Sequence, residues 1–179
     1  MSEKRPKILL TYSSGYGATK EIGEEIARVF LRERGVHIEL LPVNMVASVK
    51  EYDAVIIGTS IRADRILANT RDFLSRNKLF LREKNVALFI VCLTASTEKG
   101  KEKVMHEYLP QITKIFPSLN LISVNAFGGK IDYSKMNPVM QSLVKRVVKD
   151  KTGKSTNGSM DYRNWNHIQE WAVTLTKKL

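Results

Sequence analysis

The sequence predicts a doubly wound α/β domain, in which a mostly parallel sheet carries helices on both faces. Two patterns predict it. Short apolar runs alternate along the chain with segments of helical periodicity, and each run is apolar throughout its interior. Strands that helices cover on both faces have this uninterrupted apolar character. The chain has 179 residues and is 43% hydrophobic, so we expect one domain spanning residues 1–179.

The chain supplies five predicted strands and four main predicted helices. The first strand, 7–12 (KILLTY), ends at Ser and Gly residues. The helix that follows, 18–34, places Ile22 and Ile26 on one face and ends at Gly35. With right-handed crossovers, five such strands form a doubly wound sheet. The other predicted strands are 36–43, 52–60, 86–94 and 119–128, and the other predicted helices are 66–77, 98–116 and 162–179.

The charge balance indicates an anionic partner. Lys and Arg exceed Asp and Glu, and the net charge is +11. Such an excess attracts nucleic acid, a membrane surface or a polycarboxylate, and a solvated basic surface without a partner is the alternative. Aromatic residues are not interleaved with the basic ones, so nucleic acid is not expected.

Other features argue against a membrane span, a disulfide and a metal site. The N-terminus is polar and no apolar stretch approaches the roughly 20 residues that a spanning helix needs. We therefore expect a cytoplasmic protein, whose basic surface suits association with the inner face of a membrane. Cys92 is the one cysteine and is predicted to be buried. His37, His106 and His167 are scattered without metal-ligand spacing.

Ligands of a doubly wound sheet bind outside the carboxyl ends of the strands. That rule selects four segments of this chain, Ser13–Thr19, Thr59–Asp64, Leu93–Thr97 and Phe127–Ile131.

The first of these segments, SSGYGAT, has the composition to hold a phosphate without a cation. The first turn of a helix offers unpaired N–H groups and the positive end of the helix dipole. Glycines allow a close backbone approach, and the hydroxyls of Ser13, Ser14 and Thr19 add donors. An ordinary strand-to-helix turn capped by Thr19 would have the same residues, so the segment alone leaves both interpretations open.

Two other phosphate motifs fit less well. The one Gly-Lys-Ser sequence, at 153–155, has Val148 where a P-loop needs its first glycine, and no strand precedes it. A dinucleotide fingerprint starts at Gly15 and Gly17 but has Lys20 at its last position, although Glu39 lies at about the expected distance.

The first loop resembles that of the flavodoxin family, which has an aromatic residue, a Ser or Thr, a Gly and a Thr in this order. Here these are Tyr12, Ser14, Gly17 and Thr19, followed by the small residue Gly23. The resemblance implies a flavodoxin-like five-stranded parallel sheet with strand order 2-1-3-4-5 and helices on both faces. It also implies that the loop binds the phosphate of flavin mononucleotide (FMN).

Later segments resemble a more particular flavodoxin-like family, the menaquinone-dependent protoporphyrinogen oxidases. The segment 58–74 (GTSIRADRILANTRDFL) contains the family's Gly-x-Ser-Ile-Arg sequence after the third strand. Residues 126–148 and 161–172 resemble its basic, Met-rich insertion and its Trp-containing final helix. The resemblance implies FMN-dependent oxidation of protoporphyrinogen IX to protoporphyrin IX, a step of haem biosynthesis, with a quinone as acceptor.

The implied flavin would lie between the loops 60–63 and 93–96, neither of which contains an aromatic residue. Tyr16 and Phe127 are the nearest aromatic residues. An uncovered flavin face admits a flat substrate, which favours an enzyme over an electron carrier. The residues assigned to FMN are Ser13, Ser14, Gly15, Tyr16, Gly17, Ala18, Thr19, Ser60, Ile61, Arg62, Leu93, Thr94 and Ala95.

Arg62 is expected near the pyrimidine end of the flavin, where its charge would favour the anionic two-electron product. The alternative is a surface arginine paired with Asp64 or Asp72. No residue is an evident catalytic acid or base, so the chemistry would be that of the flavin.

The last connection, about 129–160, is predicted to be an insertion with an amphipathic helix. Within 134–151, Met136, Met140 and Leu143 belong to an apolar stripe at helical spacing, while basic residues fall off it. This is the pattern of a helix that lies at a membrane surface. A helix packed on its own domain is the alternative.

Two other functions stay open. One is a flavodoxin-type electron carrier with an acidic protein partner, against which the charge of +11 argues, because such carriers are usually acidic. The other is a flavin-dependent quinone or nitro-compound reductase. The sequence does not determine the oligomeric state.

Overall fold

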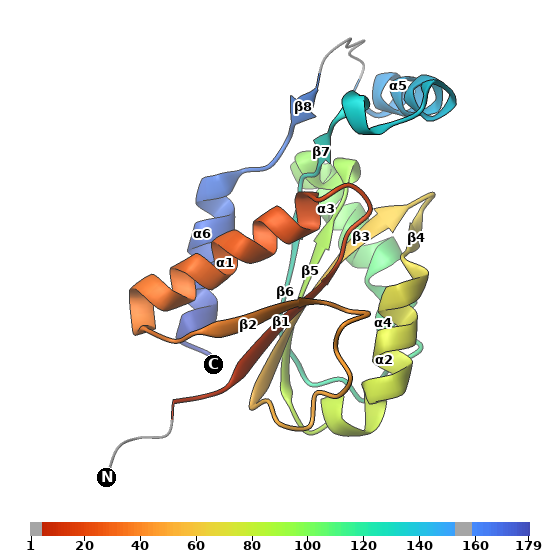
Figure 1. Cartoon of the computed structure of the whole chain (residues 1–179). Helices are drawn as coiled ribbons and strands as arrows, with labels where there is room; N and C mark the ends of the chain where they lie inside the picture. The colour runs from red at the N-terminus through yellow and green to blue at the C-terminus, as the bar shows by residue number, and fades with distance from the viewer. Residues whose placement is uncertain (1–4, 153–158) are drawn as a thin grey trace.

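The computed structural model describes residues 5–152 and 159–179, and they form a parallel sheet between two layers of helices (Figure 1). The strand order is β2-β1-β3-β5-β6, with every neighbouring pair parallel. Counted over these five strands, it is the predicted order 2-1-3-4-5. The strands are β1 (Ile8–Ser13), β2 (Ile38–Pro42), β3 (Ala54–Arg62), β5 (Asn85–Val91) and β6 (Leu121–Phe127).

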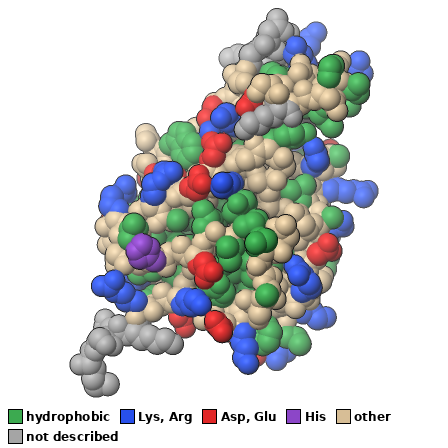
Figure 2. All heavy atoms as spheres, viewed as in Figure 1, with side chains coloured by type: hydrophobic (Ala, Val, Ile, Leu, Met, Phe, Trp, Pro, Cys, Tyr) green, Lys and Arg blue, Asp and Glu red, His purple; other side chains and the backbone are tan. Residues whose placement is uncertain are grey.

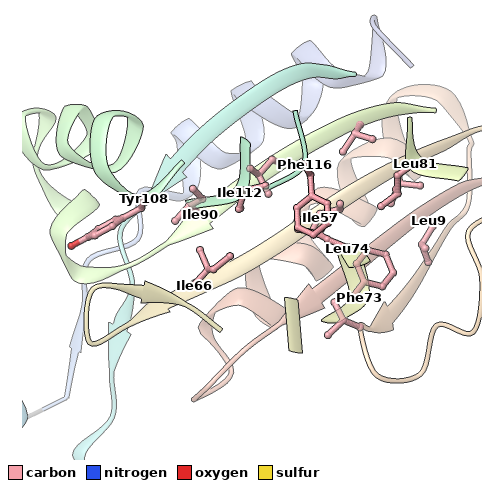
Figure 3. Close-up of a cluster of buried hydrophobic side chains, with 14 of the residues drawn as sticks. Leu9, Ile57, Ile66, Phe73, Leu74, Leu81, Ile90, Tyr108, Ile112 and Phe116 are labelled. Carbon is pink, nitrogen blue, oxygen red and sulfur yellow. The ribbon is translucent and has the colours of Figure 1, made fainter. Parts of the chain in front are cut away.

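Each face of the sheet has its own apolar core. Helices α1 (Ala18–Arg34) and α6 (Trp165–Thr176) cover one face, where Ile22, Phe30 and Trp171 pack against the strands. Helix α2 (Ala68–Leu81) and the segment 98–113 cover the other, where Phe73 is among the buried residues (Figure 3). The central strands are buried on both sides, as their uninterrupted apolar character predicted.

The predicted helix 98–116 is divided into three pieces. They are α3 (Glu98–Lys103), the π-helical turn η2 (Val104–Tyr108) and α4 (Pro110–Thr113). Pro110 has no N–H and its ring would collide with a carbonyl one turn back. The wider turn relieves this conflict, because the Leu109 N–H donates to the Val104 carbonyl, five residues back (2.9 Å).

Two predicted loops differ from the structure. Strand β3 continues to Arg62, so most of the expected loop 60–63 is a strand that turns into the short strand β4 (Arg65–Ile66). Pairing of Ile61 with Ile66 extends the strand beyond its apolar run. The predicted fourth strand, 86–94, ends at Val91, and Leu93–Ser96 form the 3₁₀ turn η1.

The insertion forms a small projecting unit after β6. Strands β7 (Lys130–Ile131) and β8 (Met160–Asp161) pair antiparallel at its base, and the 3₁₀ turn η3 (Tyr133–Lys135) and helix α5 (Pro138–Thr152) lie between them (Figure 1). Ile131, Tyr133 and Val148 form its buried cluster. Residues 1–4 and the Gly-Lys-Ser sequence at 153–155 lie outside the described residues.

Within the described ranges, no helix is both long and apolar enough to span a bilayer.

Candidate functional site

The segments selected by the sequence meet at one edge of the sheet, because β1, β3 and β5 are neighbours. Ser13 lies opposite Thr59, and Ser60 lies opposite Val91. The β1–α1 loop, the β3–β4 hairpin and turn η1 therefore leave the sheet side by side. This edge, formed by the carboxyl ends of parallel strands, is where such a sheet binds ligands.

The first loop is shaped as an anion-binding turn. Gly17 adopts φ +96°, a left-handed conformation that favours glycine. Its N–H donates to Ser14 Oγ (2.9 Å), and its carbonyl accepts the N–H of Glu21 (3.0 Å), where α1 begins. The N–H groups of residues 18–20 belong to the first helical turn, in which no helix carbonyl is available to them. They offer donors to an anion.

The three hydroxyls assigned to the loop have different surroundings. Ser13 donates to Asn69 Oδ1 at the start of α2, and Ser14 accepts the Gly17 N–H. Thr19 is 1% exposed, and its Oγ1 has no hydrogen-bond partner among the described residues. Because buried polar groups are nearly always paired, we expect a ligand to accept the hydrogen bond that this hydroxyl can donate. The loop therefore fits a phosphate group.

Arg62 joins the hairpin to the first loop. Its Nη2 donates to the Tyr16 hydroxyl (2.6 Å), and its guanidinium carbon lies 5.2 Å from the centre of the Tyr16 ring. Among the described residues, no ion pair between Arg62 and Asp72 is recorded. Arg62 is exposed and its recorded partner is a neutral hydroxyl, so its charge is available to an anionic ligand.

The hairpin is held by residues of the α3–α4 segment. Its two turn residues, Ala63 and Asp64, have φ values of +48° and +58°. Tyr108 donates to Asp64 Oδ1 (2.5 Å). Gln111 Nε2 donates to the Asp64 carbonyl (2.8 Å), and its Oε1 accepts the Ile66 N–H (3.2 Å). Figure 3 shows Tyr108 at the end of the buried cluster with its hydroxyl directed away from the other labelled side chains.

Turn η1 is packed closely against α3. A side-chain carbon on Gly100 would collide with the Thr94 carbonyl oxygen, so glycine is required there. Ala95 is 1% exposed, so it offers almost no surface to a ligand. Thr94 is half-buried and hydrogen bonds to Tyr108, so this turn and the hairpin share one anchor.

A polar hollow of about 500 Å³ lies between α3 and α6 and contains none of the residues assigned to FMN. Desolvation and the Lys101 ammonium lower the pKa of His167, which lines it. The other lining residues are Glu98, Lys101, Asn125, Asn164, Asn166 and Glu170.

Sequence reasoning missed three residues that shape this edge. Tyr108 and Gln111 anchor the hairpin from a distant segment, and no local pattern marks them. Arg163 is nearly fully buried, with 3% of its side chain exposed, and contacts Glu21 in the first turn of α1. The one local signal for Arg163 was an acidic residue two positions earlier, Asp161.

Comparisons with known proteins define the class to which this fold and site belong. The sequence profile of a family described as a flavodoxin domain matches residues 9–157, and the chain belongs to this family. A more particular relative is the protoporphyrinogen IX dehydrogenase [quinone] of Leishmania major, which is 26% identical over 179 residues, 96% of this chain and 75% of that protein.

Solved structures with the same fold include the oxidised flavodoxin 1 of Bacillus cereus. It is 15% identical with a TM-score of 0.57, and the likeness covers 97% of this chain and 99% of that one. A flavoprotein from Lactobacillus acidophilus in complex with FMN is 18% identical with a TM-score of 0.50, over 68% and 93% of the two chains. The flavodoxin-like fold is thereby confirmed, and so, at the level of the family, is the predicted cofactor.

Proposed function

We propose that this chain is an FMN-dependent oxidoreductase that oxidises protoporphyrinogen IX to protoporphyrin IX and passes the electrons to a quinone. The family and the Leishmania relative, whose name states this reaction, support the proposal. The observation that carries the FMN assignment is the first loop, where free helix N–H groups and the Thr19 hydroxyl, which has no recorded partner among the described residues, lie beside the exposed Arg62.

The chain's own residues would hold FMN at both ends. The Thr19 hydroxyl and the N–H groups of residues 18–20 bind the phosphate. Ser60–Arg62 and Leu93–Ala95 flank the ring system, and neither segment covers it with an aromatic side chain. When bound, FMN would accept two electrons at a time, so the six-electron oxidation of the porphyrinogen would take three rounds, each of which reduces one quinone.

Arg62 has the position and charge to orient a porphyrinogen. Its guanidinium bonds to the Tyr16 hydroxyl, which holds it at the mouth of the site without neutralising it. A porphyrinogen has propionate groups, and an arginine binds a carboxylate through two parallel hydrogen bonds. The same fixed charge would favour negative charge on a flavin bound beside it.

Two buried threonines test the phosphate site. Thr11, in the middle of β1, also has an Oγ1 without a recorded partner in the described part of the chain, and it is 0% exposed. Thr19→Val removes one hydrogen bond to a charged group, so the affinity for FMN falls about tenfold or more. Riboflavin, which lacks the phosphate, is expected to bind equally to the unmodified chain and to Thr19→Val. Thr11→Val leaves both affinities unchanged. Equal FMN affinity of the two variants, measured by flavin fluorescence quenching, would count against this site.

The reductant distinguishes the proposed enzyme from the two alternatives. The FMN-loaded chain is mixed anaerobically with protoporphyrinogen IX or with NAD(P)H, and flavin absorbance is followed. We expect rapid bleaching by protoporphyrinogen and recovery on addition of a quinone. Bleaching by NAD(P)H alone indicates a quinone or nitro-compound reductase. Reduction only through a partner reductase indicates an electron carrier.

We also propose that α5 contacts an anionic membrane, where a lipid-soluble quinone is available. Val139 and Leu143 are 72% and 51% exposed. Arg146 lies one turn further on the same face, and Lys149 is exposed beside it. Figure 2 shows hydrophobic and basic side chains together on this projecting part of the molecule. Exposed apolar residues that are followed by exposed cations on one helix face form a surface suited to an anionic bilayer.

Vesicle co-sedimentation tests this contact. The full chain is expected to sediment with vesicles containing phosphatidylglycerol, and less in high salt. Leu143→Asp is expected to reduce the bound fraction severalfold. Leu79→Asp provides a matched control, because Leu79 is 61% exposed on α2, outside the insertion. Equal effects of the two substitutions would contradict the proposal.

A further inference from the structure

Arg163 lies between β8 and α6 with its charge almost completely removed from solvent. Its side chain is 3% exposed, and its Nη1 contacts Glu21 Oε2 (2.6 Å). Its Nη2 and Nε contact the two Asp161 oxygens (2.5 and 2.7 Å), and its guanidinium carbon lies 4.5 Å from the Trp165 ring centre. A buried guanidinium with this geometry is a fixed charge.

Glu21 brings a carboxylate to the proposed phosphate loop. It lies in the first turn of α1, and its N–H donates to the Gly17 carbonyl (3.0 Å). One Glu21 carboxylate oxygen is 3.8 Å from the position that a side-chain carbon would take on Gly17. A carboxylate here stabilises the helix dipole but repels a phosphate dianion that binds to the same N–H groups.

Among the described residues, the other nearby charges are not recorded in contact with Glu21, and Arg62 bonds to the Tyr16 hydroxyl instead. Lys20 is half-exposed and pairs with Glu24 one turn further along α1 (3.7 Å). Asp161 adds a second carboxylate. Its pKa is lowered first by the hydrogen bond from Arg163 and, to a smaller extent, by the charge of Lys130. Arg163 is the cation recorded in contact with Glu21.

We propose that Arg163 serves as the cation of the phosphate site by acting through Glu21. The loop contains no lysine or arginine between Ser13 and Thr19, and the positive charge is supplied from a residue more than 140 positions away, after the insertion. The Arg163 guanidinium, which Glu21 shares with Asp161, offsets the Glu21 charge, and this weakens the repulsion so that the loop N–H groups and the Thr19 hydroxyl can bind the phosphate. The inference rests on the proposed FMN site and makes Arg163 a positioning residue.

The affinities of the full chain for FMN and riboflavin test the inference, because their ratio isolates the phosphate. In Arg163→Gln the preference for FMN is expected to fall about tenfold while riboflavin binding stays unchanged. In Glu21→Gln the preference is expected to rise severalfold. The double variant Glu21→Gln/Arg163→Gln is expected to return toward the original preference. Glu24→Gln removes the same charge one turn away and is the matched control.

Each outcome decides between the inference and the proposed function. If the unmodified chain prefers FMN but Arg163→Gln and Glu21→Gln leave its preference unchanged, the inference is wrong and the phosphate site stands. If the unmodified chain binds FMN no more tightly than riboflavin, the phosphate site itself is wrong. If Arg163→Gln does not fold, Glu21→Gln against Glu24→Gln decides, since an unchanged ratio in Glu21→Gln overturns the inference.

Discussion

The loop after β1 and the hairpin after β3 are adjacent rims of the candidate site, yet they obtain their shapes in different ways. In the loop, Gly17 takes the left-handed conformation and Ser14 caps its N–H from within the same segment. In the hairpin, Ala63 and Asp64 take left-handed conformations without a glycine, and residues of η2 and α4 hold them. One rim is determined locally and the other by tertiary contacts.

This difference concentrates strain in one rim. Left-handed backbone costs a non-glycine residue roughly 1–2 kcal/mol. The hairpin has two such residues in succession, and its three anchoring hydrogen bonds offset the cost. Since Arg62 belongs to this hairpin and Thr94 shares the anchor Tyr108, the position of both depends on a segment outside the loops.

The largest expected effect comes from removing the hairpin anchors. The double variant Tyr108→Phe/Gln111→Ala loses the three hydrogen bonds to the hairpin and the bond between Tyr108 and Thr94, and it keeps the buried ring. At about 1 kcal/mol each, the free energy of unfolding falls by about 4 kcal/mol, measured by urea denaturation. Hydrogen exchange should accelerate in Ile61–Ile66 before the rest of the sheet.

Gln169→Ala is the matched control for that variant. Gln169 is a partly buried glutamine with one recorded bond, to Glu25 (2.8 Å), between α6 and α1. We expect it to cost less than about 1 kcal/mol and to leave the hairpin amides protected. Unchanged protection of those amides in the double variant would show that the hairpin holds its own shape.

The left-handed turn of the first loop is expected to depend on Gly17 itself. Gly17→Ala forces a left-handed conformation on an L side chain and costs about 1–2 kcal/mol in unfolding free energy. Gly35, at the end of α1, has φ +59° and open space around it. Gly35→Ala is therefore expected to cost a similar amount, but only Gly17→Ala should also weaken FMN binding. A loss of FMN affinity in Gly35→Ala would contradict a local origin.

The same difference explains what could be predicted from the sequence. The alternation of strands and helices and the glycine-rich first loop depend on apolar runs, glycines and hydroxyls that are close together in the chain, whereas the strand order was implied by the resemblance to the flavodoxin family. The extent of β3 was not predictable, since Ile61 and Arg62 pair with residues across a turn that contains no glycine.

The anchors were invisible to local patterns for the same reason. In the sequence, Tyr108 looks like an ordinary apolar position of a helix and Gln111 like an exposed one. Folding brings both into contact with Asp64, which lies 44 and 47 positions earlier in the chain. Arg163 reaches Glu21 over a still longer interval. Side chains that act across the fold are not marked by periodicity.

Alkaline pH is expected to loosen the hairpin rim first, with an effect of about 1 kcal/mol. Burial, and then the hydrogen bond to Asp64, raise the pKa of Tyr108 above its usual value of 10.0. The unfolded chain therefore releases this proton first, so the stabilisation is complete below pH 10 and is lost as pH rises further. The slope is at most about 1.4 kcal/mol per pH unit and is expected to be absent in Tyr108→Phe.

Tyr52 provides the control for this pH effect. Burial and the hydrogen bond to Glu39 raise its pKa to about 12, so Tyr52→Phe also reduces the alkaline slope of unfolding. Tyr52 is remote from the hairpin. After correction for intrinsic exchange, the hydrogen exchange of Ile61–Ile66 is therefore expected to become insensitive to pH above 10 in Tyr108→Phe but not in Tyr52→Phe. The same insensitivity in Tyr52→Phe would contradict the assignment.

The smallest expected effect has the opposite sign and comes from giving the hairpin the residue that the first loop already has. Ala63→Gly relieves a left-handed residue at the cost of a more flexible unfolded chain, so a net stabilisation of about 0.5 kcal/mol is expected in urea denaturation. Ala27→Gly, in the interior of α1, should instead destabilise by about 1 kcal/mol. Because a relaxed turn needs its anchors less, Gln111→Ala should cost less in the Ala63→Gly background. Additive effects would mean that the anchors do not act on the strain of this turn.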